Sequence, residues 1–437
     1  MSASTALIVF ILAIIVTIVL SELLKVNIGI IGLLMAYVLG IVFSHMNAGQ
    51  IASFFPGSIF LTQLSITFFF GFAVEAGIFK GIGDRVIYRC RKAMWAIPII
   101  TMLAGLVVGA LGAGNEATPL VISPLAFAFA AEAGFNPILA ALATYCGSCW
   151  AGAMPWTSGA IFFGFATTAI GDDGNIAMWA ALIQIFVVFM VMFFVSYFIF
   201  KGHRINKSSV NISVPEPFTQ KQKTVLRIVI IAILFMILPS LLSTFVPSSA
   251  FLKTAKSICD IRLICLIGSV VCMILKVSTG REILAKRVPW GLLTMLAGMC
   301  TFMSVAGSLG IVDLLANWIS NEVPLALVPA CFVLLGGLLS FITNGITIYP
   351  LFTGMVPAMA AASGLSPIFF CACVMTGCFP SGFSPISTGG VMAVIGASDE
   401  VKTQIWWKQM GIALFGVVIN VLLTLVGFTQ LIVNILT

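Results

Sequence analysis

Two short polar stretches with matching residues interrupt an otherwise apolar chain of 437 residues. Residues 114–118 read Gly-Asn-Glu-Ala-Thr, and residues 343–347 read Thr-Asn-Gly-Ile-Thr. Pro155-Trp-Thr-Ser-Gly159 follows the first, and Pro385-Ile-Ser-Thr-Gly389 follows the second. The offset is 229 residues at the asparagines and 230 at these prolines, close to half the chain. Paired Gly/Pro-interrupted segments in two halves predict the binding site of a transporter.

The residue types in these stretches suit a small anion together with cations. Asparagine both donates and accepts hydrogen bonds, and hydroxyl groups do either. Helix N-termini at such breaks carry a partial positive charge that favours a carboxylate, whereas unwound carbonyls and hydroxyls favour Na⁺. The predicted substrate-binding residues are Asn115, Thr118, Thr157, Ser158, Asn344, Thr347, Ser387 and Thr388. The predicted cation-binding residues are Gly114, Asn115, Glu116, Gly147, Pro155, Thr343, Asn344, Gly377 and Pro385.

Two alternatives stay open at these positions. The Asn, Ser and Thr side chains could simply cap broken helix ends or join helices together. Glu116 could bind a cation or carry a proton, because a carboxylate at membrane depth is a functional hypothesis by default. It could also be merely solvated, and the second half has Gly345 at the equivalent place. The predicted site contains no Lys or Arg, so helix ends, polar groups and bound cations would have to hold a carboxylate.

The composition indicates an integral membrane protein. The chain is 61% hydrophobic and 8% charged, whereas soluble domains carry about 25% charged residues. Most of the eleven cysteines lie inside apolar runs, which indicates helix packing. Metalloprotease, serine-hydrolase and nucleotide-binding motifs do not occur, so we expect neither an enzyme nor a cofactor. Na⁺ or H⁺ is the expected coupling ion, with no transition metal and no nucleic-acid partner.

The apolar runs predict an all-α polytopic fold of two repeats joined by a linker, with about ten crossings and two re-entrant hairpins. The expected N-terminal repeat is 1–200, the linker 201–224 and the C-terminal repeat 225–437. The N-terminal repeat comprises scaffold helices over 5–79, a hairpin over 94–134, a Pro-broken helix over 137–170 and a helix over 175–200. The C-terminal repeat comprises scaffold helices over 225–309, a hairpin over 325–364, a Pro-broken helix over 367–397 and a helix over 408–434.

Charge predicts the orientation of these elements. With the linker in the cytoplasm, 18 of the 21 basic residues fall on the cytoplasmic side, as the positive-inside rule requires. Five crossings in each repeat make the repeats inverted and place both termini outside. Two complete crossings in place of each hairpin would give the same sidedness, so charge leaves re-entrance open.

This arrangement resembles the ion transporter superfamily, in particular the divalent-anion:sodium symporters and the malonate/C4-dicarboxylate carrier branch. Phe70–Gly77 and Gly114–Gly134 look most like the second branch. The symporters carry Ser-Asn-Thr at each tip, whereas here only the asparagines match. The resemblance implies a homodimer in a bacterial inner membrane, with a fixed scaffold and an elevator-type mobile part. It also implies Na⁺-coupled uptake of a small dicarboxylate.

Three other functions compete with this reading. A cation/proton antiporter of the same superfamily would use Glu116. A sensor or assembly factor would need an output domain, and the longest polar loop is too short to form one. A channel is hard to reconcile with closed hairpin tips.

Overall fold

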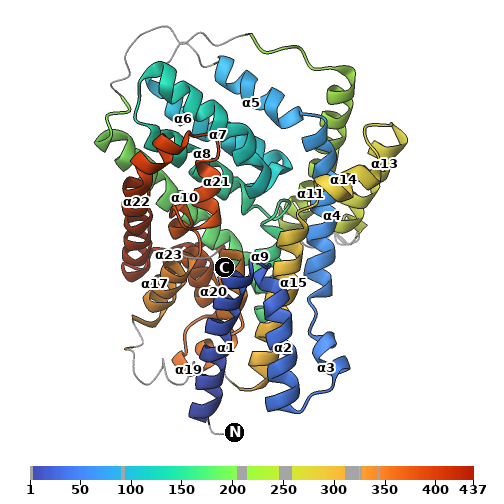
Figure 1. Cartoon of the computed structure of the whole chain (residues 1–437), viewed down its shortest axis with the longest axis vertical. Coiled ribbons are helices and arrows are strands. Elements are labelled where there is room, and N and C mark those ends of the chain that lie inside the picture. The colour runs from blue at the N-terminus through green and yellow to red at the C-terminus, as the bar shows by residue number, and fades with distance from the viewer. Residues whose placement is uncertain are drawn as a thin grey trace.

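The computed structural model describes residues 3–89, 94–203, 214–245, 258–310, 324, 327–341 and 345–437, and these residues contain helices and no strand. Figure 1 shows the arrangement. The first half consists of α1 (Ala3–Leu24), α2 (Ile28–Ser44), α3 (Ala48–Ser53), α4 (Gly57–Glu75), α5 (Ile78–Arg89), η1 (Met94–Ala96), α6 (Ile97–Val108), η2 (Gly109–Ala113), α7 (Gly114–Ala133), α8 (Pro137–Gly152), α9 (Ala160–Ile170) and α10 (Asp173–Ile199).

The second half begins with α11 (Gln220–Phe245), and its elements follow a similar order. They continue with α13 (Ile261–Ile274), α14 (Gly280–Lys286), α15 (Trp290–Ser308), α17 (Val328–Ser340), α18 (Gly345–Thr353), α19 (Val356–Ser363), α20 (Pro367–Gly377), η4 (Pro380–Phe383), α21 (Thr388–Ala393), α22 (Asp399–Leu425) and α23 (Phe428–Leu436). Three of the described helices, α4, α10 and α22, are long and apolar enough to cross a membrane by length and composition.

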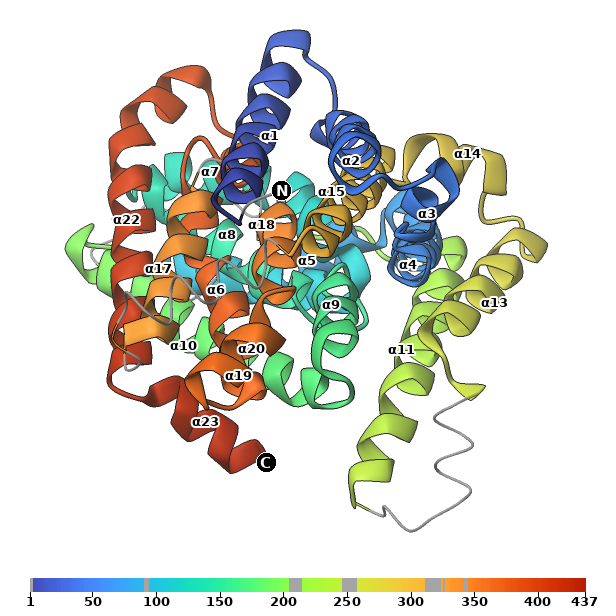
Figure 2. The same cartoon turned by 90° about the horizontal axis from the view of Figure 1, so that it is seen from below.

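The helices form two groups that lie on opposite sides in both views (Figures 1 and 2). One group contains α2, α4, α11, α13 and α15, in which α2 packs against α15 and α4 against α13. The other group contains α6 to α10 and α17 to α23, with α8 and α20 near its centre. In element order, α2 of the first half corresponds to α13 of the second, and α4 corresponds to α15. The pair α2–α15 therefore corresponds to the pair α13–α4. This reciprocal pairing is what a two-fold relation between the halves requires, and the inversion of the repeats stays a prediction.

Two stretches differ from the expected helices. In place of one helix over 408–434, α22 begins at Asp399 and ends at Leu425, and α23 follows it. The earlier start follows from the Ser398 hydroxyl, which accepts a hydrogen bond from the Val401 N–H. Gly427 separates the two helices with a φ of +80°, a conformation that glycine adopts readily. The returning part of the hairpin expected over 325–364 is likewise divided into α18 and α19.

A network of uncharged polar side chains joins α10 to α22 and α23 inside the second group of helices. The Gln184 amide donates to Asn420 Oδ1 at 2.8 Å and accepts from the Thr429 hydroxyl at 2.5 Å. Asn420 in turn donates to the Thr376 carbonyl at 2.8 Å, close to the end of α20. These side chains are buried away from water, so they depend on one another as hydrogen-bond partners.

Asn420→Ala is therefore expected to lower the melting temperature of the protein in detergent. The substitution leaves the Gln184 amide and the Thr376 carbonyl short of partners, at a cost of about 1–3 kcal/mol in the free energy of unfolding. Asn434→Ala is the matched control, because Asn434 is exposed and contacts only Gln430 among side chains. Equal melting temperatures for the two variants would show that the network contributes nothing to stability.

Candidate functional site

The first duplicated stretch lies at a sharp bend between α6 and α7. Gly112 has a φ of +105° and Gly114 a φ of +64°, so two residues leave the helical path close together. A side chain at Gly112 is excluded twice, because a methyl group there would also come within 1.9 Å of the Phe70 ring on α4. We call residues 109–115 the first tip. It contacts the α4 side of the molecule at Phe70, and α7 begins within it at Gly114.

The helix that follows is interrupted between Gly152 and Ala160, around Pro155. Thr157 lies in the interruption, and its hydroxyl is 2.8 Å from both the Gly152 and the Met154 carbonyls and 3.2 Å from that of Ala151. The hydroxyl is thus a hydrogen-bond donor for carbonyls at the end of α8 that have no partner within the helix.

The first tip and this interruption are in direct contact. A methyl group at Gly152 would lie 2.8 Å from the Asn115 Cβ, which shows how closely the two backbones approach. Asn115, at the start of α7, is thus held against the end of α8.

The second half brings the corresponding elements together in a similar way. α20 ends at Gly377, and η4 and a turn precede α21 at Thr388. Gly345, at the start of α18, approaches the end of α20, because a methyl group there would lie 2.7 Å from the Cys378 carbonyl oxygen. The predicted residues Thr343 and Asn344 lie outside the described residues, as does the side chain of Thr347.

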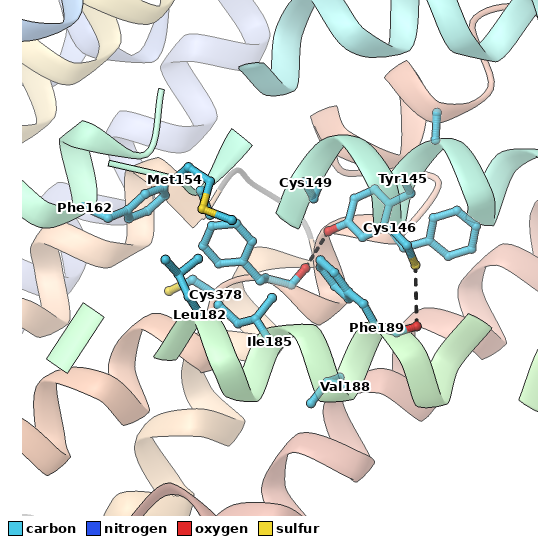
Figure 3. Close-up of a cluster of buried hydrophobic side chains, with 14 of the residues drawn as sticks. Tyr145, Cys146, Cys149, Met154, Phe162, Leu182, Ile185, Val188, Phe189 and Cys378 are labelled. Atoms are coloured by element: carbon cyan, nitrogen blue, oxygen red, sulfur yellow. Dashed lines mark hydrogen bonds between the residues drawn. The ribbon is translucent and has the colours of Figure 1, made fainter. Parts of the chain in front are cut away.

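A cavity of about 40 Å³ lies where these segments of the two halves meet. The lining comes from both halves and comprises Asn115, Tyr145, Cys149, Gly152, Ser158, Phe162, Gly345, Cys378, Phe379, Gly382, Ser387 and Gly389. We call it the central cavity. The Cys149 thiol donates to Asn115 Oδ1 at 3.1 Å, and Figure 3 places Cys149 beside Tyr145. Figure 3 also places Cys378 and Phe162 on the same side of Tyr145.

Among the described residues, three predicted site residues line this cavity: Asn115, Ser158 and Ser387. Ser158 and Ser387 are buried, and Asn115 is partly buried. The backbone of Gly345, which follows Asn344, also contributes. The structure thus brings together residues that are more than 200 positions apart in the sequence, one set from each duplicated stretch.

The other predicted residues are placed differently. The hydroxyl of Thr118 donates to the Gly114 carbonyl at 2.6 Å, and Thr157 is used as described above, so neither side chain lines the central cavity. Thr388 is exposed. Pro155 and Pro385 lie in the two interruptions and are partly exposed. Glu116 belongs to the first turn of α7, and its side chain lies outside the described part of the structure.

Gly147 and Gly377 occupy equivalent contacts between helices. A methyl group at Gly147 would lie 2.4 Å from the Met102 carbonyl oxygen, and one at Gly377 would lie 2.8 Å from that of Val333. In both halves a glycine therefore lets the helix before the tip approach the helix before the interruption. Their predicted part in cation binding stays a prediction, and their packing position is what the structure gives.

Several lining residues were not predicted, and Tyr145 is the most informative. Its hydroxyl donates to the Phe379 carbonyl, so it connects α8 of the first half to the interruption of the second. Its ring contacts Phe383, with centroids 5.2 Å apart, and Phe189 at 5.6 Å. In the sequence Tyr145 lies in a largely apolar helix that also contains Trp150, and no spacing distinguishes it.

The central cavity is small, and the described residues that line it carry no charge. They include no carboxylate, ammonium or guanidinium group, and their polar groups are an amide, hydroxyls, thiols and backbone. The volume accommodates only a few water-sized groups and is smaller than a dicarboxylate. Among the described residues there is no group of three His, Cys, Asp or Glu side chains that could hold a metal ion. Hydroxyl, amide and carbonyl oxygens are ligands that a hard cation such as Na⁺ accepts.

Tyr145→Phe is expected to lower the melting temperature while keeping the aromatic packing. The loss is one hydrogen bond to a buried carbonyl, which costs about 1–3 kcal/mol in the free energy of unfolding when the carbonyl stays unpaired. Tyr197→Phe is the matched control, because its hydroxyl donates to the Trp95 carbonyl away from the central cavity. Substrate transport should fall in Tyr145→Phe and persist in Tyr197→Phe. If transport instead persists in Tyr145→Phe and falls in Tyr197→Phe, Tyr145 is not part of the binding site.

Comparison with known proteins agrees with the helical transporter fold. Residues 4–153 match the family model described as the N-terminus of the dicarboxylate carrier protein MatC. No curated protein matches the sequence. Among solved structures, the YdaH transporter of Alcanivorax borkumensis is similar, with a TM-score of 0.56, 16% sequence identity and coverage of 87% of each chain. The resemblance to the dicarboxylate carrier branch is thus confirmed over residues 4–153, and the helical fold is similar to that of the YdaH transporter.

Proposed function

We propose that the chain is a secondary active transporter that carries a small dicarboxylate, coupled to Na⁺. The observation that carries the proposal is the central cavity, in which Asn115 and Ser158 from one duplicated stretch meet Ser387 from the other. The matching family model is that of a dicarboxylate carrier, which supports the class of substrate.

The electrostatics of the cavity support coupling to a cation. A dicarboxylate carries two negative charges, and burial of a charge without a partner is costly. The described residues of the lining include no Lys or Arg to neutralise them. Bound Na⁺ ions, held by amide, hydroxyl and carbonyl oxygens around the tips, supply the missing positive charge. Substrate and cation are therefore expected to bind together.

The packing supports an elevator-type movement. The first tip, the start of α18, the interrupted helices, α10 and α22 pack together as one group, which would carry the cavity as a unit. This group meets the α2–α4 and α13–α15 side through limited contacts, of which Phe70 against Gly112 lies nearest the first tip. In the proposed cycle this contact breaks and reforms. The homodimer that the resemblance implies would hold the scaffold side still.

Uptake by purified protein in liposomes tests this function. Radiolabelled C3–C6 dicarboxylates are offered with an inward Na⁺ gradient, with the same gradient of choline, and with a pH gradient alone. We expect concentrative uptake of at least one dicarboxylate only in Na⁺. A pH-driven cation flux without transport of any organic anion, abolished by Glu116→Gln, would instead identify an antiporter.

A further inference from the structure

A second cavity, of about 150 Å³, lies beside the first tip and is lined by a different set of residues, apart from Ser158. Its walls come from α4, from the first tip and the start of α7, and from the end of α14. We call it the side cavity. Ser158 lines both the side cavity and the central cavity, so the two are separated by little more than this side chain and the tip.

The exposed end of the side cavity carries two positive charges. Lys286 and Arg287 both belong to its lining, and their side chains are 65% and 38% exposed. Each has a carboxylate partner: Lys286 lies 2.9 Å from Glu282, and Arg287 lies 2.7 Å from Glu75. Neither Glu282 nor Glu75 belongs to the lining. The two basic residues therefore border the cavity, while their charged groups are paired with carboxylates outside its lining.

The opposite wall of the side cavity also favours a negatively charged ligand. Gly114 and Ala117, in the first turn of α7, contribute to it. The N-terminus of a helix of 20 residues presents unpaired N–H groups and a partial positive charge. At the buried end, the Ser158 hydroxyl donates to the Gly152 carbonyl at 3.1 Å, and it must leave that carbonyl to donate to an anion. Cations at the mouth, a helix N-terminus along one wall and a hydroxyl at the end form a path for an anion.

We propose that the side cavity is an access site for the carboxylate substrate, in which Arg287 and Lys286 receive a carboxylate that then passes Ser158 into the central cavity. Glu75 competes with the incoming carboxylate for Arg287. This inference rests on the proposed function. It adds the path by which the carboxylate reaches the central cavity, and two residues that affect how fast the carboxylate binds. Charges at the mouth of a site act mainly on association and its salt dependence.

The matched pair Arg287→Gln and Arg281→Gln tests the route. Both remove one arginine charge from the same short helix region, but Arg281 is exposed and does not line the side cavity. Dicarboxylate transport is measured in vesicles of each orientation, at low and at high ionic strength. For Arg287→Gln we expect KM to rise about two- to fivefold from one membrane face only, with a weaker salt dependence than wild type. Arg287→Lys should retain most of the wild-type KM, and Arg281→Gln should match wild type.

Glu75 variants separate an access role from a structural ion pair. Glu75→Gln removes the competitor and is expected to lower KM from that same face. If Arg287→Gln is unstable because Glu75 stays unpaired, the double variant Glu75→Gln/Arg287→Gln removes both charges and should still show the raised KM. KM values and salt dependence equal to those of Arg281→Gln from both faces would overturn the proposal. If wild type carries no dicarboxylate, the proposed function itself fails, so the two failures are distinguishable.

Discussion

Asn115→Ala is expected to reduce dicarboxylate transport about 10- to 100-fold with little change in the melting temperature. Asn115 contributes the amide of the central cavity, where it can donate to a carboxylate and accept from, or coordinate, a cation. Hydrogen bonds to charged groups contribute about 1.5–3 kcal/mol, which sets this range. The loss of transport should appear as reduced uptake in liposomes at equal amounts of folded protein.

Asn136→Ala is the control that makes the result specific. Asn136 precedes α8, and its side chain accepts a hydrogen bond from the Ile138 N–H at 3.2 Å. Removal of such a cap costs about 1 kcal/mol in the free energy of unfolding. We therefore expect lower stability and retained transport, opposite to Asn115→Ala. Full transport by Asn115→Ala would exclude this side chain from the site.

Gly147→Ala is expected to lower the melting temperature strongly, or to prevent folding. The added methyl group would lie 2.4 Å from the Met102 carbonyl oxygen and 3.0 Å from the Leu106 nitrogen, so α6 and α8 must separate. Overpacking of a buried contact costs about 1–3 kcal/mol, and backbone neighbours leave little room to relax. Gly377→Ala, with its nearest contact at 2.8 Å, should show a smaller effect.

Gly411→Ala is the matched control for both substitutions. Gly411 lies within α22 and has no neighbour within 4 Å of an added methyl group. Alanine there should stabilise the helix by about 0.5–1 kcal/mol. If Gly147→Ala keeps the wild-type melting temperature but loses its response to Na⁺, the glycine contributes to a cation site rather than to packing.

The sequence was informative where polar residues interrupt apolar helices. Asn115, Ser158 and Ser387 are conspicuous in their stretches, and the repetition pairs one half with the other. The same signal predicts more ligand-binding hydroxyl groups than the structure places in the cavity. Thr118 and Thr157 have the right type and spacing, but their hydroxyls bind carbonyls of their own chain segment. Local hydrogen bonds of this kind cannot be distinguished from ligand contacts by residue type.

The residues that sequence reasoning missed are those with no local signal. Tyr145, Cys149 and Cys378 lie in apolar helices or at their ends, where thiols and aromatic rings usually indicate packing. Gln184 and Asn420 are isolated amides 236 positions apart, and only the packing of α10 against α22 brings them together.

The basic residues of the side cavity were also not recognised. In the sequence, Arg287 fits the positive-inside rule as one of several interfacial charges. The structure places it 2.7 Å from Glu75 on another helix and in the wall of a cavity beside the first tip. The positive charge of Arg287 predicts the side of the membrane on which it lies. The residues that it contacts depend on how α4 packs against α14, which the sequence does not show.

The thermal stability of the purified protein tests the central claim most directly. Melting temperatures are measured with a panel of C3–C6 carboxylates, each in Na⁺ and in choline buffer, because a ligand that binds only the folded state raises the melting temperature. The account predicts stabilisation by a dicarboxylate in Na⁺ but not in choline, and loss of this response in Asn115→Ala. A melting temperature that responds to Na⁺ or pH alone, and to no carboxylate, would contradict it.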